Sequence, residues 1–235
     1  SLLQLQPPVK VVYPEGVAPP PEPPSANTAA RISSFYILPK LHKKTISGRP
    51  IVNTINSPTY MTSLYLHKVL LVAQPHLPSI VMSTHDALRK LHSAKIPPNA
   101  VLLCADVMSL YPSIPIPYGL RAVKSKLTTL KQSGLISQDI NIDLTLALLE
   151  WTLRNNYLSY LDDYYLQLTG TAMGTPVAVM YANIVLAYLE HCALNELPYL
   201  YMRYIDDLCV ICKDEEQAED IIYYFEQECS SIQLD

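Results

Sequence analysis

The chain has 235 residues and a formal net charge of −4, with 49% hydrophobic and 16% charged residues. This composition excludes an intrinsically disordered chain, because disorder requires low hydrophobicity and high charge. The charge is uneven: residues 1–150 carry 14 Lys and Arg against 7 Asp and Glu, whereas residues 151–235 carry 3 against 14. A basic half suits phosphates and an acidic half suits cations, although two solvated surfaces explain the same counts more simply.

The N-terminal part of the chain predicts an extended arm followed by a basic hairpin. Residues 7–24 are rich in proline, which fixes φ and removes a hydrogen-bond donor, so this stretch cannot form a helix or an inner strand, and the proline-rich arm is predicted over residues 1–30. Arg31–Leu38 and Arg49–Thr54 are predicted strands, and Lys40–Gly48 is the turn between them. The proline in the second strand favours the edge of a sheet.

Apolar residues at helical spacing predict several helices. Five of them are Tyr60–Gln74, a helix capped by Ser83 or Thr84 that runs to Leu91, Pro117–Lys131, Leu144–Arg154 and Glu215–Cys229. Among these helices lies the apolar run Val101–Ala105, which predicts a buried strand that ends at Asp106.

Two hairpins and a glycine loop complete the predicted elements. Asn156–Leu168 and Tyr199–Cys212 are hairpins that turn at their acidic pairs, and Gly170–Pro176 opens onto the apolar helix Val177–Asn195. The uncharged run Tyr164–Leu189 is long enough to span a bilayer, but its glycines and proline favour a buried loop and helix. Because strands and helices follow no regular alternation, an α+β fold is favoured.

The cysteines do not form a recognisable metal or disulfide pattern. The five are irregularly spaced, and the single C-x-x-C pair, Cys209 and Cys212, has no second pair and no histidine nearby. We interpret all five as reduced core thiols of an intracellular protein.

Three aspartates are notable for their positions. Asp106 ends an apolar strand, and Asp206 and Asp207 lie at the tip of an apolar hairpin. Such residues are ordinarily turn formers, but three carboxylates brought together would repel one another unless a divalent cation such as Mg²⁺ neutralised them. Spacing alone does not single out this hairpin, because Tyr160–Asp163 (YLDD) has the same four-residue sequence pattern as Tyr204–Asp207 (YIDD).

Five short motifs occur in an order that resembles a known family. They are FYILPKLHK (Phe35–Lys43), GRPIV (Gly48–Val52), DVMSLYPSIP (Asp106–Pro115), QLTGTAMGTP (Gln167–Pro176) and RYIDDL (Arg203–Leu208). Together they are similar to the reverse transcriptase domain of Penelope-like retroelements, relatives of telomerase, from about residue 31 to residue 235. The resemblance implies a right-hand polymerase with fingers at 31–100 and an antiparallel palm sheet packed on helices at 101–235, with the thumb absent.

The resemblance also implies an enzyme, an RNA-directed DNA polymerase. It would join a dNTP to the 3′-hydroxyl of a DNA primer on an RNA template, using two Mg²⁺ ions or Mn²⁺ in their place. Asp106, Asp206 and Asp207 would be the catalytic residues and would hold the metal ions, together with the carbonyl of Val107. Tyr111 would pack under the incoming sugar and exclude a 2′-hydroxyl, although a core aromatic is the simpler interpretation of this residue.

Further contacts follow from the same resemblance. The nucleotide triphosphate would be held by Lys40 and Arg49, and Met173 and Gly174 would line the nucleotide pocket. Contacts to the template or primer backbone would come from His42, Lys43 and Lys44, for which a solvated basic turn is an equal alternative.

Three other functions remain open from the residues. The chain could be a non-catalytic nucleic-acid-binding relic of the same fold, an RNA-templated RNA polymerase, or a membrane protein built around the uncharged run. The intact aspartates favour an enzyme over a relic, and we expect no membrane partner. A nuclear or intracellular location is expected only from the family.

Overall fold

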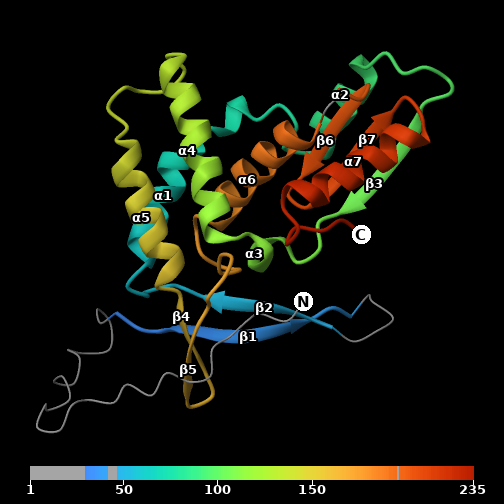
Figure 1. Ribbon diagram of the computed structural model, residues 1–235. Helices are drawn as coiled ribbons and strands as arrows, with labels where there is room; N and C mark the ends of the chain where they lie inside the picture. Colours follow the sequence, from blue (N-terminus) through green and yellow to red (C-terminus); the bar gives the residue numbers. More distant parts are fainter. Residues whose placement is uncertain (1–29, 42–46, 195) are drawn as a thin grey trace, which may run out of the picture.

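The computed structural model describes residues 30–41, 47–194 and 196–235 (Figure 1). The predicted proline-rich arm, apart from residue 30, lies outside the described residues. The same holds for the predicted nucleic-acid contacts His42, Lys43 and Lys44.

The first sheet has four strands in the order β2-β1-β4-β5. The strands are β1 (Ser33–Pro39), β2 (Gly48–Asn53), β4 (Tyr157–Tyr160) and β5 (Asp163–Leu166). Strand β1 pairs antiparallel with β2 and parallel with β4. The predicted edge position of the proline-containing strand is confirmed, because β2 ends the sheet. Strands from both sequence regions, 31–100 and 101–235, share this sheet.

The second sheet has three antiparallel strands in the order β3-β7-β6. They are β3 (Val101–Asp106), β6 (Leu200–Tyr204) and β7 (Asp207–Cys212). Strand β3 was predicted to be buried, and this prediction is wrong: its residues alternate between half-buried and exposed, and Leu102 is 63% exposed. The exposed residues Leu102, Cys104 and Asp106 alternate with the half-buried ones, so they share one face of the strand, and that face is left uncovered.

Seven α-helices and one short 3₁₀ helix are described in residues 30–41, 47–194 and 196–235. They are α1 (Tyr60–Leu71), η1 (Gln74–His76), α2 (Thr84–Ser93), α3 (Leu110–Ser113), α4 (Ile116–Gln132), α5 (Ile142–Arg154), α6 (Ala178–Ala193) and α7 (Glu215–Glu228). The predicted cap of α2 is confirmed, because the Ser83 hydroxyl accepts a hydrogen bond from the backbone N–H of Asp86.

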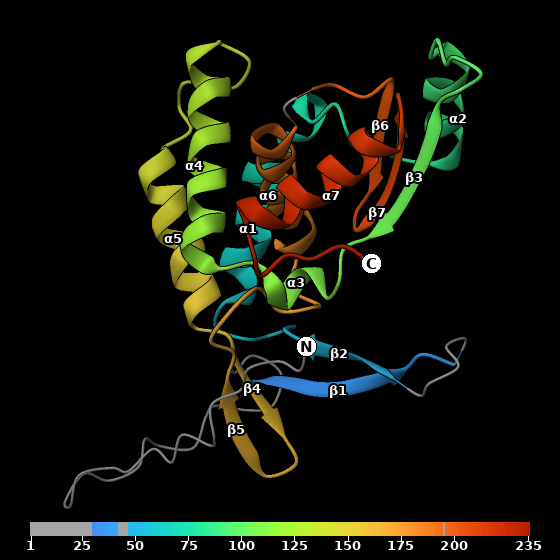
Figure 2. The ribbon, with the colours of Figure 1, turned by 45° about the vertical axis from the view of Figure 1, so that its right-hand side comes forward.

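Helix α6 is the centre of the core. Most of its residues are buried, and it contacts α1, α3, α4 and α7. Figure 2 shows it between the pair α4–α5 on one side and α7 with the second sheet on the other. The uncharged run therefore forms the end of β5, a loop and a buried helix, and the predicted loop and buried helix are confirmed. None of the helices in the described part of the chain is both long and apolar enough to cross a membrane.

Three cysteines differ from the prediction of five core thiols. All five are free, but Cys104 and Cys192 are exposed and Cys209 is half-buried. Only Cys212 and Cys229 are buried. Cys104 is exposed because it lies on the uncovered face of β3.

Candidate active site

Asp106 and Asp207 are direct partners across the β3–β7 ladder. Two sets of backbone bonds show that this pair is of the non-hydrogen-bonded kind. The next pair along, Val107 and Asp206, is joined by a bond from the Val107 N–H to the Asp206 carbonyl (3.0 Å), and the N–H and C=O of Asp106 bond Asp235 instead (3.0 and 2.9 Å). In antiparallel strands, side chains of non-hydrogen-bonded pairs are the closer ones.

Asp206 lies in a strained two-residue turn between β6 and β7. The preceding residue, Ile205, has φ of 57°, a left-handed conformation that is rare for a β-branched side chain. The turn is held from two sides: Val107 bonds the Asp206 carbonyl, and the Arg203 guanidinium donates to the Ile205 carbonyl at 2.8 Å. The surrounding bonds therefore determine the position of this acidic turn.

Arg203 is fully buried and was not singled out by sequence reasoning. Its guanidinium forms an ion pair with Glu190 of α6 and donates to the side chain and the carbonyl of Asn183, at 2.9 and 3.2 Å. Its backbone N–H and C=O also bond Ser79 and Val81. Arg203 thus links α6 to the carbonyl of the acidic turn. The signal was present in the sequence, since an acidic residue in an apolar helix needs a cation, and residues 151–235 contain only three Lys and Arg.

The second acidic hairpin has the same local turn but different surroundings. Leu161, the counterpart of Ile205, has φ of 55°. It is 83% exposed, and its hairpin strand β5 ends the first sheet. No third strand lies beside Asp162 and Asp163 in the described topology. The two hairpins, which share one sequence pattern, are therefore distinguished by their tertiary surroundings. Of the two acidic pairs, only Asp206 and Asp207 adjoin Asp106.

The aspartates fit a hard divalent cation by their donor chemistry. Within the described residues, no three His, Cys, Asp or Glu side chains converge into a metal-ligand group by themselves. Asp106 and Asp207 nevertheless lie on facing backbone positions, and Asp206 is next to Asp207. The three carboxylates could therefore coordinate a shared ion after rotation of their side chains alone. Carboxylate oxygens are the ligands that Mg²⁺ prefers, and it fills its other positions with water and phosphate.

Tyr111 lies close to the acidic turn, in the short helix α3. Its ring is half-buried, and burial, together with the negative charge of Asp206, raises the pKa of its phenol. Its carbonyl accepts a bond from the N–H of Thr171 at 2.9 Å. The residue is thus fixed to the glycine loop on one side and influenced by the carboxylate on the other.

The glycine loop joins the first sheet to helix α3 through close backbone contacts. Gly174 has φ of 131°, and a Cβ there would lie 2.3 Å from the carbonyl oxygen of Val52 in β2. The adjacent Met173 carbonyl accepts a bond from the Val52 N–H at 2.9 Å. At the other end, a Cβ on Gly170 would lie 2.3 Å from the Tyr111 carbonyl oxygen. Only glycine permits both approaches.

Ser63 of α1 is a second residue that sequence reasoning missed. It is fully buried. Its hydroxyl oxygen accepts a bond from the Val177 N–H at 3.0 Å and lies 2.7 Å from the Thr175 hydroxyl. It therefore caps the start of α6 from a different helix, and no local pattern could have indicated this.

The predicted triphosphate ligands lie on the β1–β2 hairpin. Lys40 follows β1, and its N–H bonds the Ser47 carbonyl at 2.8 Å, which closes the hairpin. Arg49 is exposed and pairs with Leu38 in the ladder. Figures 1 and 2 both show this hairpin below α3, on the side where β3 ends. Both cations are thus on the element that adjoins the glycine loop through β2.

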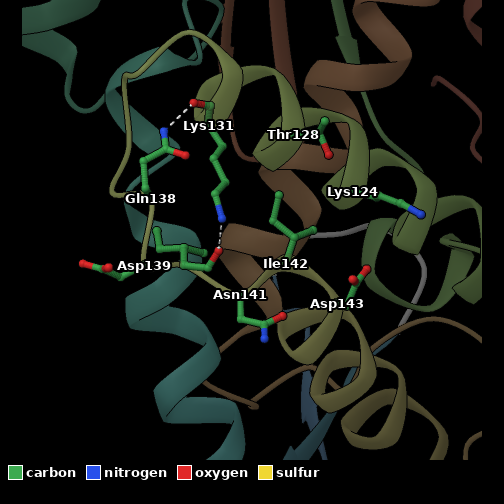
Figure 3. A pocket seen from close by; sticks show the side chains of 9 residues that line it. Lys124, Thr128, Lys131, Gln138, Asp139, Asn141, Ile142 and Asp143 are labelled. Carbon is green, nitrogen blue, oxygen red and sulfur yellow. Dashed lines mark hydrogen bonds between the residues drawn. The ribbon is translucent and has the colours of Figure 1, made fainter.

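A polar pocket of about 480 Å³ lies away from these residues, between α4 and the start of α5 (Figure 3). Among the residues that line it, Lys131 Nζ donates to the Ile140 carbonyl at 2.9 Å, and the Gln138 side-chain amide donates to the Lys131 carbonyl at 2.8 Å. These bonds hold the loop between the two helices. None of the predicted site residues lines this pocket.

Several solved structures share this architecture. The apo telomerase of Candida tropicalis truncated from its C-terminal domain matches with a TM-score of 0.62 and 13% identity, over 86% of this chain and 48% of that one. The same organism's telomerase in complex with a TWJ fragment of telomeric RNA gives 0.65 and 12%, over 89% and 40%. An insertion-loop deletion mutant of a human picobirnavirus RNA-dependent RNA polymerase gives 0.66 and 15%, over 87% and 40%.

These identities establish the fold alone, and the chain spans less than half the length of each of these three structures. The predicted α+β fold, with an antiparallel sheet packed on helices as in polymerase fingers and palm, is confirmed. No curated protein sequence matches the chain. The family model described as reverse transcriptase (RNA-dependent DNA polymerase) matches residues 41–235. The chain therefore belongs to the reverse transcriptase family.

Proposed function

We propose that the chain is the fingers and palm of an RNA-directed DNA polymerase from a Penelope-like retroelement. A primer 3′-hydroxyl would attack the α-phosphate of a dNTP, and pyrophosphate would leave. The observation that supports this most directly is the facing position of Asp106 and Asp207, with Asp206 bonded to the neighbouring Val107. A nuclear or intracellular location accompanies this proposal.

The proposed cofactor is a pair of Mg²⁺ ions, or Mn²⁺ in their place. Asp106, Asp206, Asp207 and the carbonyl of Val107 would hold them. When bound, such ions would activate the attacking hydroxyl and neutralise the charge on the leaving group. The chain's own contribution is to hold the carboxylates on adjacent strands, through the Arg203 and Val107 bonds to the turn.

The proposed nucleotide site lies between this turn and the β1–β2 hairpin. Tyr111 would lie under the sugar, and Lys40 and Arg49 would bind the triphosphate, Arg49 through a planar fork of donors. Met173 and Gly174 would line the base side of the pocket. The proposed template and primer contacts, His42, Lys43 and Lys44, lie outside the described residues.

An RNA polymerase is the second candidate, because the likeness to the picobirnavirus RNA polymerase is as close as the likeness to telomerase. Tyr111 favours deoxynucleotides, since an aromatic ring under the sugar leaves no room for a 2′-hydroxyl. A non-catalytic relic is the third candidate, and the three intact aspartates count against it.

Primer extension on the full-length protein tests the proposal. With an RNA template and a DNA primer, we expect extension with dNTPs and Mg²⁺, no extension after chelation by EDTA, and much weaker use of NTPs. Equal or better use of NTPs would favour the RNA polymerase. Metal-independent RNA binding without any extension would favour the relic.

A further inference from the structure

Cys104 and Cys209 are direct partners across the β3–β7 ladder, two pairs along from Asp106 and Asp207 and on the same sheet face. Successive side chains of a strand alternate between faces, so residues two apart share one. Hydrogen-bonded and non-hydrogen-bonded pairs also alternate along an antiparallel ladder. The Cys pair, two positions from the Asp pair, is therefore of the non-hydrogen-bonded kind as well. The sequence did not reveal it, because 104 residues separate the two positions and the C-x-x-C pattern drew attention to Cys212 instead.

Both thiols are free, and the face that carries them is open at β3. Cys104 is exposed and Cys209 is half-buried. Facing residues in such pairs have Cα atoms about 4.5 Å apart, and a disulfide requires a Cα separation of roughly 4.4–6.8 Å. The ladder thus holds two thiols at a spacing that a disulfide can bridge without moving the strands. Cys212 lies on the opposite face of β7 and cannot substitute for Cys104.

We propose that Cys104 and Cys209 form a thiol modification site that closes to a disulfide by exchange with a small disulfide such as oxidised glutathione. The exposed Cys104 thiolate attacks one glutathione sulfur, breaks its S–S bond and releases one glutathione. Cys209 then attacks the Cys104 sulfur and releases the second glutathione. Two protein thiols are oxidised by two electrons, one glutathione disulfide is reduced, and the two protein protons leave on the released thiols.

The consequence for catalysis rests on the proposed function. A disulfide fixes the Cβ–S–S–Cβ dihedral near 90°, and it would therefore restrict the twist between β3 and β7. The same two strands set the spacing of Asp106 and Asp207. Closing the disulfide is expected to slow primer extension, and dithiothreitol is expected to restore it.

Mass spectrometry of the full chain tests the site without any activity assay. After treatment with oxidised glutathione, a Cys212→Ser variant should give a tryptic cross-link between the peptides that contain Cys104 and Cys209. Exposed Cys192 should carry only glutathione, which shows that the reagent had access. Glutathione on Cys192 without the Cys104–Cys209 cross-link would overturn the proposal, and so would a Cys209–Cys212 disulfide in the unmodified sequence.

Extension assays on the same samples test the link to the carboxylates. The oxidised protein should lose at least half of its extension rate and regain it with dithiothreitol, whereas Cys104→Ser should keep its rate in both states. A complete cross-link with an unchanged extension rate would overturn the link. Absence of extension in the reduced protein, with the cross-link present, would count against the proposed function and not against the thiol site.

Discussion

The Arg203 guanidinium and the Glu190 carboxylate form a buried ion pair beneath the turn that carries Asp206 and Asp207. The Arg203 side chain is 0% exposed and the Glu190 side chain is 6% exposed. A second nitrogen of the same guanidinium supports the strained turn at the Ile205 carbonyl. The pair therefore couples the stability of the core to the position of the carboxylates.

Removing the negative partner should destabilise the fold. Glu190→Gln leaves the guanidinium buried without its counter-charge, and we expect a loss of about 3–5 kcal/mol in the free energy of unfolding, measured by urea denaturation. The control is Glu150→Gln, which breaks the exposed Arg154–Glu150 pair on α5, where we expect at most about 1 kcal/mol. Similar losses in the two variants would contradict the role assigned to burial.

Replacing the Arg203 guanidinium by an amine should affect catalysis more than nucleotide binding. Arg203→Lys keeps the charge beside Glu190 but lacks the planar donors that reach Asn183 and the Ile205 carbonyl. We expect a lower kcat for extension with little change in the KM for dNTP. An increase in KM at unchanged kcat would mean that Arg203 acts on the nucleotide and does not position the turn.

The glycine loop should not tolerate a side chain where it meets β2. Gly174→Ala places a Cβ against the Val52 carbonyl at a positive φ, so we expect a loss of more than about 2 kcal/mol in thermal or urea denaturation. Gly134→Ala is the control, because Gly134 also has a positive φ but no atom lies within 4 Å of its Cβ position. An equally small loss at both positions would show that the contact with β2 is dispensable.

Tyr111 should control the choice of sugar. Tyr111→Ala removes the ring proposed to lie under the incoming nucleotide, so we expect the ratio of kcat/KM for dNTP over NTP to fall at least tenfold, about 1.4 kcal/mol of discrimination. Tyr223→Ala, on the exposed face of α7, should leave the ratio unchanged. If sugar discrimination survives in Tyr111→Ala, the residue is a core aromatic.

Local features of the fold were predictable because they depend on local patterns. Helix caps, turn residues and apolar periodicity indicated most helices and both acidic hairpins, and the proline in β2 indicated a sheet edge. The apolar run of β3 was misleading, because such a run does not show whether both faces of the strand are covered. The parallel pairing of Ser33 with Leu158 depends on tertiary packing that no local pattern encodes.

The candidate site was predictable only in part for the same reason. The motif order indicated Asp106, Asp206 and Asp207, but spacing alone could not separate the YIDD hairpin from the YLDD hairpin. Ser63, which caps α6 from α1, and Cys104, which faces Cys209, depend on pairings between distant segments. Arg203 could have been found, since Glu190 in an apolar helix requires a cation.

The central claim is that Asp106, Asp206 and Asp207 form the catalytic site. The two acidic hairpins test it most directly, because they share one sequence pattern and only one of them adjoins Asp106. Extension by full-length Asp206→Asn should fall at least about a hundredfold with an unchanged unfolding midpoint, as expected when a group that stabilises developing charge is lost. Asp162→Asn should stay within about twofold of the unmodified enzyme, as expected for an exposed turn residue outside the site. Extension by Asp206→Asn at a rate near that of Asp162→Asn would contradict the account.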